Sequence, residues 1–342
     1  MSSLSVSVVM PARNAERTLA ASVASLQAQD LGDLEIVLVD HASDDDTGAI
    51  MDRLARDDER IRVHRWDGTF VEAANLAWQA ATGDLIARMD ADDIAHPARL
   101  RMQRDVLAAQ PDLAGCGTLV RIRKRLENGD LAPADGGYQR YERWINGVVS
   151  PEAIAAERFV DSPLPNPTMM LRREVLVAAG GYADPEWAED YDLWLRLLEQ
   201  GHRLGKLPEV LLDWLDGPTR ATRSQDRYSL ALFQEAKAHY LSRHPMVREK
   251  GVVICGAGPT GKDLAKRLRR HGVVIHAFLE VNERQIGQRI AGLPVLASDR
   301  AAEFTGLAVM LSAAGRAPAR ETIRELITGA GFCEGDDFFC VA

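Results

Sequence analysis

Three carboxylates follow the apolar run at residues 85–89, in the order Asp90, Asp92 and Asp93. Negative charges this close repel one another, and a divalent cation relieves the repulsion most readily. Carboxylates without a partnering imidazole or thiol suit a hard ion, Mg²⁺ or Mn²⁺. Alternatively, Asp93 caps a helix that Pro97 helps to start, and the other two carboxylates are solvated.

Asp40 ends the apolar run at residues 35–39, and a turn rich in polar residues continues to Thr47. A carboxylate in this position could accept hydrogen bonds from the N–H group of a nucleobase. For Asp44 to Asp46 we favour a simpler role, the capping of the helix that follows.

Glu189 and Asp190 stand between Trp187 and Trp194 at the start of a predicted helix. Acidic residues in a first helical turn complement the helix dipole, so their charge alone does not indicate a site. Flanking by two indoles, however, could remove water from a carboxylate and raise its pKa. A general base needs a pKa shifted in this direction.

The elements that must position these residues alternate between strands and helices. Strands are predicted at 5–10, 35–39, 61–64 and 85–89, and helices from about residue 14, through residues 50–54, at 73–82 and from about 97. Repeated strand–helix units predict a doubly wound sheet with parallel strands. Ligands of such sheets bind beyond the carboxyl ends of the strands, where residues 11–14, 40–46 and 90–93 would lie.

The middle of the chain offers fewer signals. Residues 126–147 are rich in glycine and turn formers, and we interpret them as a loop whose Tyr138, Tyr141 and Trp144 form a lid or anchor it to the core. A helix is predicted from about Ser224 to Arg243, broken by His244-Pro245. Because a fresh strand–turn–helix pattern starts at Gly251, we predict two domains, 1–245 and 246–342.

The second predicted domain carries a glycine turn. Gly256, Gly258 and Gly261 follow the strand at 252–255, and Glu280 closes the next strand, as in a dinucleotide-binding fingerprint. This pattern allows a nucleotide or NAD(P) site. The glycines could equally permit only tight strand–helix packing in a module that binds nothing. A phosphate-binding NTPase loop is excluded because Asp263 stands where that loop needs Ser or Thr.

The composition is that of a globular enzyme with a proper core. The 342 residues are 46% hydrophobic and 27% charged, and the net charge is −9. Residues 1–245 carry 39 acidic against 28 basic residues, which argues against nucleic-acid binding. We see no signal peptide or membrane-spanning run. The scattered cysteines, Cys116, Cys255, Cys333 and Cys340, fit a reducing compartment. We expect a cytoplasmic protein, with peripheral membrane contact still possible.

Five blocks together resemble a known family. They read SVVMPARNAERTL, EIVLVDHASDDDT, GDLIARMDADDIAHPARL, NPTMMLRREVLVAAGGY and AEDYDLWLRL. In order and spacing they are similar to the inverting family 2 glycosyltransferases, over about residues 4–215. The resemblance implies a GT-A fold, with a doubly wound mixed sheet, followed by a smaller Rossmann-like α/β domain.

Residue roles follow from the resemblance. It makes Asp90-Ala91-Asp92 the DxD motif, in which Asp92 and Asp90 hold Mn²⁺ or Mg²⁺ at the donor's diphosphate. It makes Asp190 the base that deprotonates the acceptor hydroxyl. The donor-binding residues implied are Pro11, Ala12, Arg13, Asp40, Arg88 and Asp90, and Glu189 and Trp194 would lie on the acceptor side.

The sequence departs from the family pattern at several positions. The turn after the second strand usually has two acids and a glycine, and here it is Asp40-His41-Ala42. Ala74 stands where many members have Arg, and Asn166 stands where His is common. The QxxRW motif of processive synthases is absent, which favours single sugar additions. Arg220 and Arg223 could clamp the diphosphate or form a solvated turn.

We therefore expect a metal-dependent inverting glycosyltransferase that uses a nucleotide sugar, with a UDP-sugar favoured. The acceptor would be a glycan, lipid-linked or small molecule in surface-glycan biosynthesis. One alternative is a nucleotide-sugar sensor without catalysis. The other is an NAD(P)-dependent oxidoreductase built on Gly256 to Glu280, which the lack of an evident hydride-transfer partner disfavours.

Overall fold

The protein is described here from a computed structural model that covers residues 4–126, 130–216, 226–315 and 317–342. Its contacts divide the chain into two compact units. The first unit consists of residues 1–151, 164–185 and 189–224, and the second of residues 152–163, 186–188 and 225–342. The described helices include none that is both long and apolar enough to cross a membrane.

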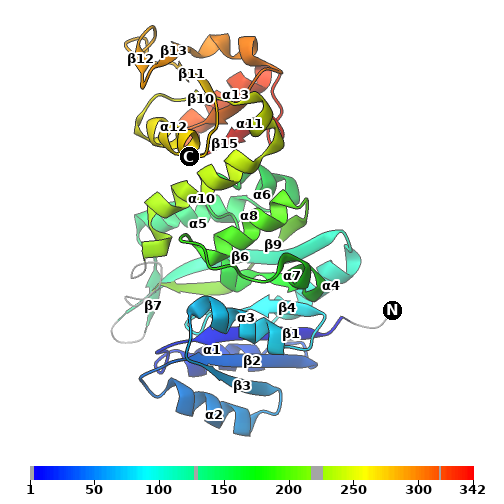
Figure 1. Ribbon diagram of the computed structural model, residues 1–342. Coiled ribbons are helices and arrows are strands. Elements are labelled where there is room, and N and C mark those ends of the chain that lie inside the picture. The colour runs from blue at the N-terminus through cyan, green and yellow to red at the C-terminus, as the bar shows by residue number, and fades with distance from the viewer. Residues whose placement is uncertain (1–3, 127–129, 217–225, 316) are drawn as a thin grey trace. The chain divides into compact units, whose positions relative to one another are not determined.

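The first unit opens with alternating strands and helices (Figure 1). These are β1 (Val6–Ala12), α1 (Leu19–Gln27), β2 (Leu34–His41), α2 (Thr47–Asp57), β3 (Ile61–Trp66), α3 (Phe70–Ala80) and β4 (Leu85–Arg88). The four strands are parallel and lie in the order β3-β2-β1-β4. The strand order therefore reverses beside β1, and the loops after β1 and β4 diverge there, as at the ligand crevice of doubly wound sheets.

Alternation of side chains along β1 explains why helices cover both faces of the sheet. Val8 and Met10 point into a buried cluster that also holds Leu19 and Val23 of α1. Helix α3 contributes no residue to that cluster, yet it contacts β1 and β2. It therefore covers the opposite face, and the predicted doubly wound arrangement is confirmed.

The rest of the first unit makes the sheet mixed. Its elements are β5 (Ile94–Ala95), α4 (Arg99–Ala109), β6 (Leu113–Arg125), β7 (Leu131–Pro133), α5 (Gly136–Gly147), η1 (Asn166–Thr168), β8 (Met170–Arg172), α7 (Arg173–Ala179), α8 (Glu189–Glu199) and β9 (Arg203–Asp216). Strand β8 pairs antiparallel with β4 and β6, whereas the long strands β6 and β9 are parallel.

The prediction of a loop over residues 126–147 was wrong for α5. Tyr138, Tyr141 and Ile145 recur at helical spacing, and this outweighs the glycines at the ends of the helix. Ile145 is fully buried, and the partly buried Tyr138, Tyr141 and Trp144 pack against the core cluster. The aromatic side chains therefore anchor this segment.

The second unit contains a smaller sheet in the order β12-β13-β11-β10-β14-β15, parallel except at β12. Its elements are α6 (Pro151–Glu157), η2 (Asp226–Tyr228), α10 (Leu230–Arg243), α11 (Pro245–Lys250), β10 (Val252–Cys255), α12 (Pro259–Arg270), β11 (Ile275–Glu280), β12 (Arg289–Ile290), β13 (Leu293–Ala297), η3 (Ser298–Phe304), β14 (Val309–Ser312), α13 (Ala317–Gly329) and β15 (Phe338–Cys340). The Rossmann-like character predicted for this part is confirmed.

Two boundaries differ from the sequence expectation. Helix α10 starts at Leu230, where the hydroxyl of Ser229 accepts a hydrogen bond from the Leu232 N–H, and not at about Ser224, which lies outside the described residues. The second compact unit also takes in α10 and residues 152–163, which the sequence places in the first domain. The extents 1–245 and 246–342 stay a prediction.

The glycine turn of the second unit yields a test of packing. A Cβ added at Gly261 would lie 2.0 Å from the Gly256 carbonyl oxygen, whereas one added at Gly258 would meet nothing within 4 Å. We expect Gly261→Ala to lower the free energy of unfolding by about 2 kcal/mol, because backbone must move to relieve the clash. Gly258→Ala, the matched control, should cost less than about 1 kcal/mol. Urea unfolding measures both, and equal losses would contradict the packing role of Gly261.

Candidate functional site

The loops that follow β1 and β2 are tied to one another by hydrogen bonds. The Asn14 N–H donates to the Ser43 hydroxyl (3.1 Å), and the Asp44 N–H donates to Asn14 Oδ1 (2.9 Å). The Ala15 N–H donates to Thr47 Oγ1 (2.7 Å). These bonds fix both loops as one wall at the carboxyl ends of the strands.

The residues predicted to bind a nucleotide line that wall. Pro11 and Ala12 are buried at the end of β1, and Arg13 is exposed just beyond it. The Asp40 carboxylate is 7% exposed and is held by the Arg65 guanidinium (3.4 Å) and by the Ser43 N–H (3.3 Å). The side chain therefore has a fixed orientation at the end of β2.

The three carboxylates after β4 come together as the sequence predicts. Asp90, Asp92 and Asp93 each offer an oxygen, and these atoms lie within 4.8 Å of one another. Asp93 is fully buried, and its Oδ1 accepts a hydrogen bond from the Leu215 N–H (2.8 Å). The alternative in which Asp93 caps α4 is therefore wrong, since Ala98 occupies the N-cap position of that helix. An all-oxygen set of this kind fits Mg²⁺ or Mn²⁺.

Arg88 is directed at this cluster. Its side chain is buried, and one guanidinium nitrogen lies 2.6 Å from Asp90 Oδ1. A second guanidinium nitrogen donates to the Met89 carbonyl oxygen. In this structure Arg88 therefore orients Asp90, while its predicted contact with the donor stays a prediction.

A second buried arginine supports the same turn and was missed from the sequence. Arg99 is fully buried, and it donates to the Arg88 carbonyl oxygen (2.8 Å) and to Gln103 Oε1 (3.1 Å). Gln103 in turn donates to the carbonyl oxygens of Cys116 and Thr168. Burial lowers the pKa of Arg99 to about 10, so the side chain keeps its charge at neutral pH.

The predicted base lies within electrostatic reach of these carboxylates. Asp190 stands in the first turn of α8, and burial raises the pKa of its carboxyl group. The negative charges of Glu189 and Asp90 raise that pKa further. Glu189 is 2% exposed. The negative charge of Asp90 thus acts on the first turn of α8.

A network around Tyr182 also reaches this site. The Asn75 side chain and the Tyr182 backbone exchange two hydrogen bonds (2.8 and 2.9 Å), and the Tyr182 hydroxyl donates to Asn166 Oδ1 (3.1 Å). Within α8, Arg196 is paired with Asp192 (2.8 Å). Asn166, noted above as a departure from the family, is thus a hydrogen-bond acceptor for the Tyr182 hydroxyl.

Two sequence expectations about this site gain no support from the described residues. Trp194 is fully buried in the core. Its acceptor-side role therefore stays a prediction, because a fully buried side chain offers no surface to an acceptor. Arg220 and Arg223, considered as a diphosphate clamp, lie outside the described residues.

The glycine turn of the second unit forms hydrogen bonds with the side chain of Glu280. The Ala257 N–H donates to Glu280 Oε2 (2.9 Å), and the Val281 N–H donates to Glu280 Oε1 (2.9 Å). A small hollow beside the turn has a mainly apolar lining that includes Cys255, Leu279 and Glu280. The carboxylate of the fingerprint thus stabilises its own loop, and no ligand role follows from this geometry alone.

Two family models match the chain in separate stretches. Residues 7–176 match the model described as glycosyl transferase family 2. Residues 247–332 match the model described as a CoA binding domain. The first match contains the wall after β1 and β2 and the carboxylates after β4.

Curated relatives cover the same part. The putative glycosyltransferase EpsE of Bacillus subtilis is 30% identical over 66% of this chain and 78% of its own length. The O-antigen biosynthesis glycosyltransferase WbnJ of Escherichia coli is 28% identical, over 61% of this chain and 78% of its own. An uncharacterized glycosyltransferase of Haemophilus influenzae is 28% identical, over 61% of this chain and 64% of its own.

Solved structures share the fold. Residues 1–349 of S. aureus TarS, in complex with UDP-GlcNAc, superpose with a TM-score of 0.55 at 17% identity, over 78% of this chain and 72% of that one. The mannosyltransferase PcManGT of Pyrobaculum calidifontis, in complex with GDP-Man and Mn²⁺, gives 0.50 at 20% identity, over 79% and 69%. At these identities the likeness establishes the GT-A fold alone.

Ala42 in the site wall provides a test of backbone strain. Its φ of 48° is in the left-handed region, which costs a residue with a side chain about 1 kcal/mol. We expect Ala42→Gly to raise the free energy of unfolding by up to about 1 kcal/mol. Ala20→Gly on the exposed face of α1 should instead lower it by about 1 kcal/mol. Denaturant titration compares the two, and a loss of stability in Ala42→Gly would contradict the strain.

Proposed function

Since the chain belongs to glycosyltransferase family 2, we propose that it is an inverting, metal-dependent glycosyltransferase. It moves a sugar from a nucleotide diphosphate donor, a UDP-sugar, to a hydroxyl acceptor in surface-glycan or polysaccharide biosynthesis. The observation that carries the proposal is the gathering of Asp90, Asp92 and Asp93 after β4, where oxygens of the three carboxylates lie within 4.8 Å of one another. The names of EpsE and WbnJ support this function class.

The donor side is built from the carboxyl ends of three parallel strands. Pro11 to Arg13 line the nucleotide pocket, and the fixed carboxylate of Asp40 receives the N–H of the base. Asp92 and Asp90 would hold Mn²⁺ or Mg²⁺, which when bound neutralises charge on the leaving diphosphate. Asp90 is also paired with the buried guanidinium of Arg88.

The acceptor side depends on Asp190. Its carboxylate removes the proton from the acceptor hydroxyl as that oxygen bonds to the sugar's anomeric carbon. The bond from this carbon to the diphosphate oxygen breaks on the opposite side, so the anomeric configuration inverts. A pKa raised by burial and by Glu189 suits a group that must accept a proton near neutral pH.

The remaining assignments extend the proposal to the whole chain. We assign the transferase activity to residues 1–245 and place the protein in the cytoplasm. Residues 246–342 form a Rossmann-like domain, for which a nucleotide site at Gly256, Gly258, Gly261 and Glu280 stays an open prediction.

Asp190 provides the test of this function. We expect Asp190→Asn to lower turnover by at least about 100-fold and to leave UDP binding unchanged, because the amide cannot accept the proton. In the wild type, turnover should rise with pH through an apparent pKa of about 7, since only the ionised carboxylate acts as the base. Glu174→Gln, which changes an exposed acid of α7, is the control. Turnover of Asp190→Asn near the wild-type rate, or an acid limb near pH 4, would contradict the assignment.

A further inference from the structure

Three arginines share one face of β6 near its carboxyl end. Val120 and Ile122 of this strand are buried in the core cluster of the first unit. The strand pairs regularly with β9 over this stretch, so its side chains alternate between the two faces of the sheet. Arg121, Arg123 and Arg125 therefore lie on the face opposite the core. We call these three residues the arginine row.

The arginine row is short of negative charge. Among the residues that the structure describes, only Asp213 of β9 forms ion pairs with it, at 3.9 Å from an Arg121 nitrogen and 3.7 Å from Arg123 Nε. Both distances are too long for hydrogen bonds. Arg123 Nε is buried and forms no hydrogen bond with a described residue, and Arg125 forms no ion pair with one. Three positive charges thus face one negative charge.

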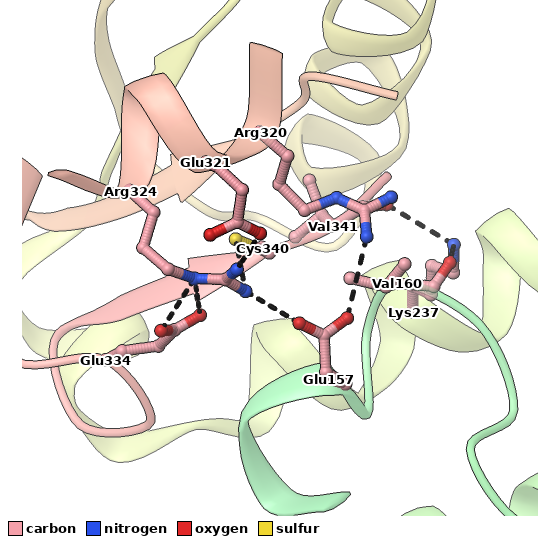
Figure 2. A network of polar contacts seen from close by, with 9 residues as sticks. All are labelled: Glu157, Val160, Lys237, Arg320, Glu321, Arg324, Glu334, Cys340 and Val341. Atoms are coloured by element: carbon pink, nitrogen blue, oxygen red, sulfur yellow. Dashed lines mark hydrogen bonds and ion pairs between the residues drawn. The ribbon is translucent and has the colours of Figure 1, made fainter. Parts of the chain in front are cut away.

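Clustered arginines do not by themselves indicate a ligand, as the second unit shows (Figure 2). Arg324 of α13 pairs there with Glu157 (2.6 Å) and with Glu334 (2.8 Å). Glu321 pairs with the same guanidinium (2.6 Å), and an Arg320 nitrogen lies 3.6 Å from Glu157. Two arginines meet three carboxylates, so their charges are neutralised within the protein. In the arginine row the balance is reversed.

Strand β9 connects the arginine row to the carboxylate cluster after β4. Asp213 is the register partner both of Arg121 in β6 and of Ile94 in β5. Ile94 directly follows Asp93 of the cluster. Neighbouring strands lie about 4.8 Å apart, so the backbones at Arg121 and Ile94 are about 10 Å apart. Strand β9 also contacts the cluster directly, since the Leu215 N–H donates to Asp93 Oδ1 (2.8 Å).

From this excess of positive charge beside the cluster we infer that the arginine row binds a phosphate group of the acceptor. Guanidinium groups stay charged at neutral pH, and their paired N–H donors match the oxygens of a phosphate. The inference rests on the proposed function, which places the donor's diphosphate at the carboxylate cluster. A donor with a neutral sugar brings no second anion, so the anion for the row comes from the acceptor. The acceptor is then a phosphate ester or a diphosphate, either soluble or linked to a lipid.

Binding of inorganic pyrophosphate to the full-length protein tests the row. A chelator is present, so that pyrophosphate cannot bind to the carboxylate cluster through a metal. We expect Arg125→Gln to weaken pyrophosphate binding, measured by calorimetry, by at least about tenfold, because hydrogen bonds to a charged group are lost. Arg203→Gln is the matched control, because Arg203 starts β9 at its opposite end and pairs with Asp112. Equal affinity in Arg125→Gln and the wild type would overturn the inference.

Asp213 gives a test that a folding defect cannot imitate. Asp213→Asn keeps the shape of the side chain and removes the negative charge beside Arg121 and Arg123. We therefore expect its affinity for pyrophosphate to rise by about threefold or more, since the row then faces no carboxylate among its described ion partners. An affinity equal to or below that of the wild type would overturn the inference.

Vesicle binding identifies the source of the phosphate. The protein is floated with phosphatidylcholine vesicles that either contain or lack a polyprenyl phosphate. Capture that needs the polyprenyl phosphate and is lost in Arg125→Gln supports a lipid-linked acceptor. Pyrophosphate binding at the row without such capture supports a soluble one.

UDP binding with Mn²⁺ separates the inference from the proposed function. It should be equal in Arg125→Gln and the wild type, and a loss in the variant would assign the row to the donor and overturn the inference. Pyrophosphate binding at the row in a protein that transfers sugar from no nucleotide sugar would contradict the proposed function alone. Sugar transfer by a protein that does not bind pyrophosphate would contradict the inference alone.

Discussion

Electrostatic repulsion among carboxylates is the constraint that the surrounding structure has to meet. Asp90, Asp92 and Asp93 gather after β4, and Asp90 also acts on Asp190. Part of the repulsion is offset by buried Arg88 and by the hydrogen bond that Asp93 receives from β9. Burial raises the pKa of Asp190, and the negative charges of Glu189 and Asp90 raise it further.

This crowding also connects the fold to the chemistry. Parallel strands with helices on both faces bring β1, β2 and β4 to one edge, where their loops meet. Arg99 stabilises the turn after β4 by donating a hydrogen bond to the Arg88 carbonyl oxygen. Gln103, which is hydrogen-bonded to Arg99, donates to the carbonyl oxygen of Thr168. The site is therefore held by buried polar contacts from several elements, which favours a single geometry over a flexible one.

The sequence predicts the features that depend on local pattern. Apolar runs followed by turn residues locate β1 to β4, and the position of Asp90 to Asp93 after β4 marks them as a site. Helix α5 was missed because the glycines at its ends are typical of loops and because only a short face of the helix is buried. Arg99 reads as a solvated residue of a charged helix, and only tertiary packing shows that it is buried. The ion pairs of Asp213 with Arg121 and Arg123 join distant segments, which no local pattern can reveal.

The most direct test of the account is nucleotide binding with and without metal. A thermal-shift series with UDP, GDP, CDP and dTDP, each with Mn²⁺ or with a chelator, measures stabilisation of the folded state by ligand. The account predicts that UDP raises the melting temperature only when Mn²⁺ is present, and that Asp92→Asn removes this effect. Equal stabilisation by UDP in the chelator, or stabilisation by none of the four nucleotides, would contradict a metal-dependent donor site at the carboxylate cluster.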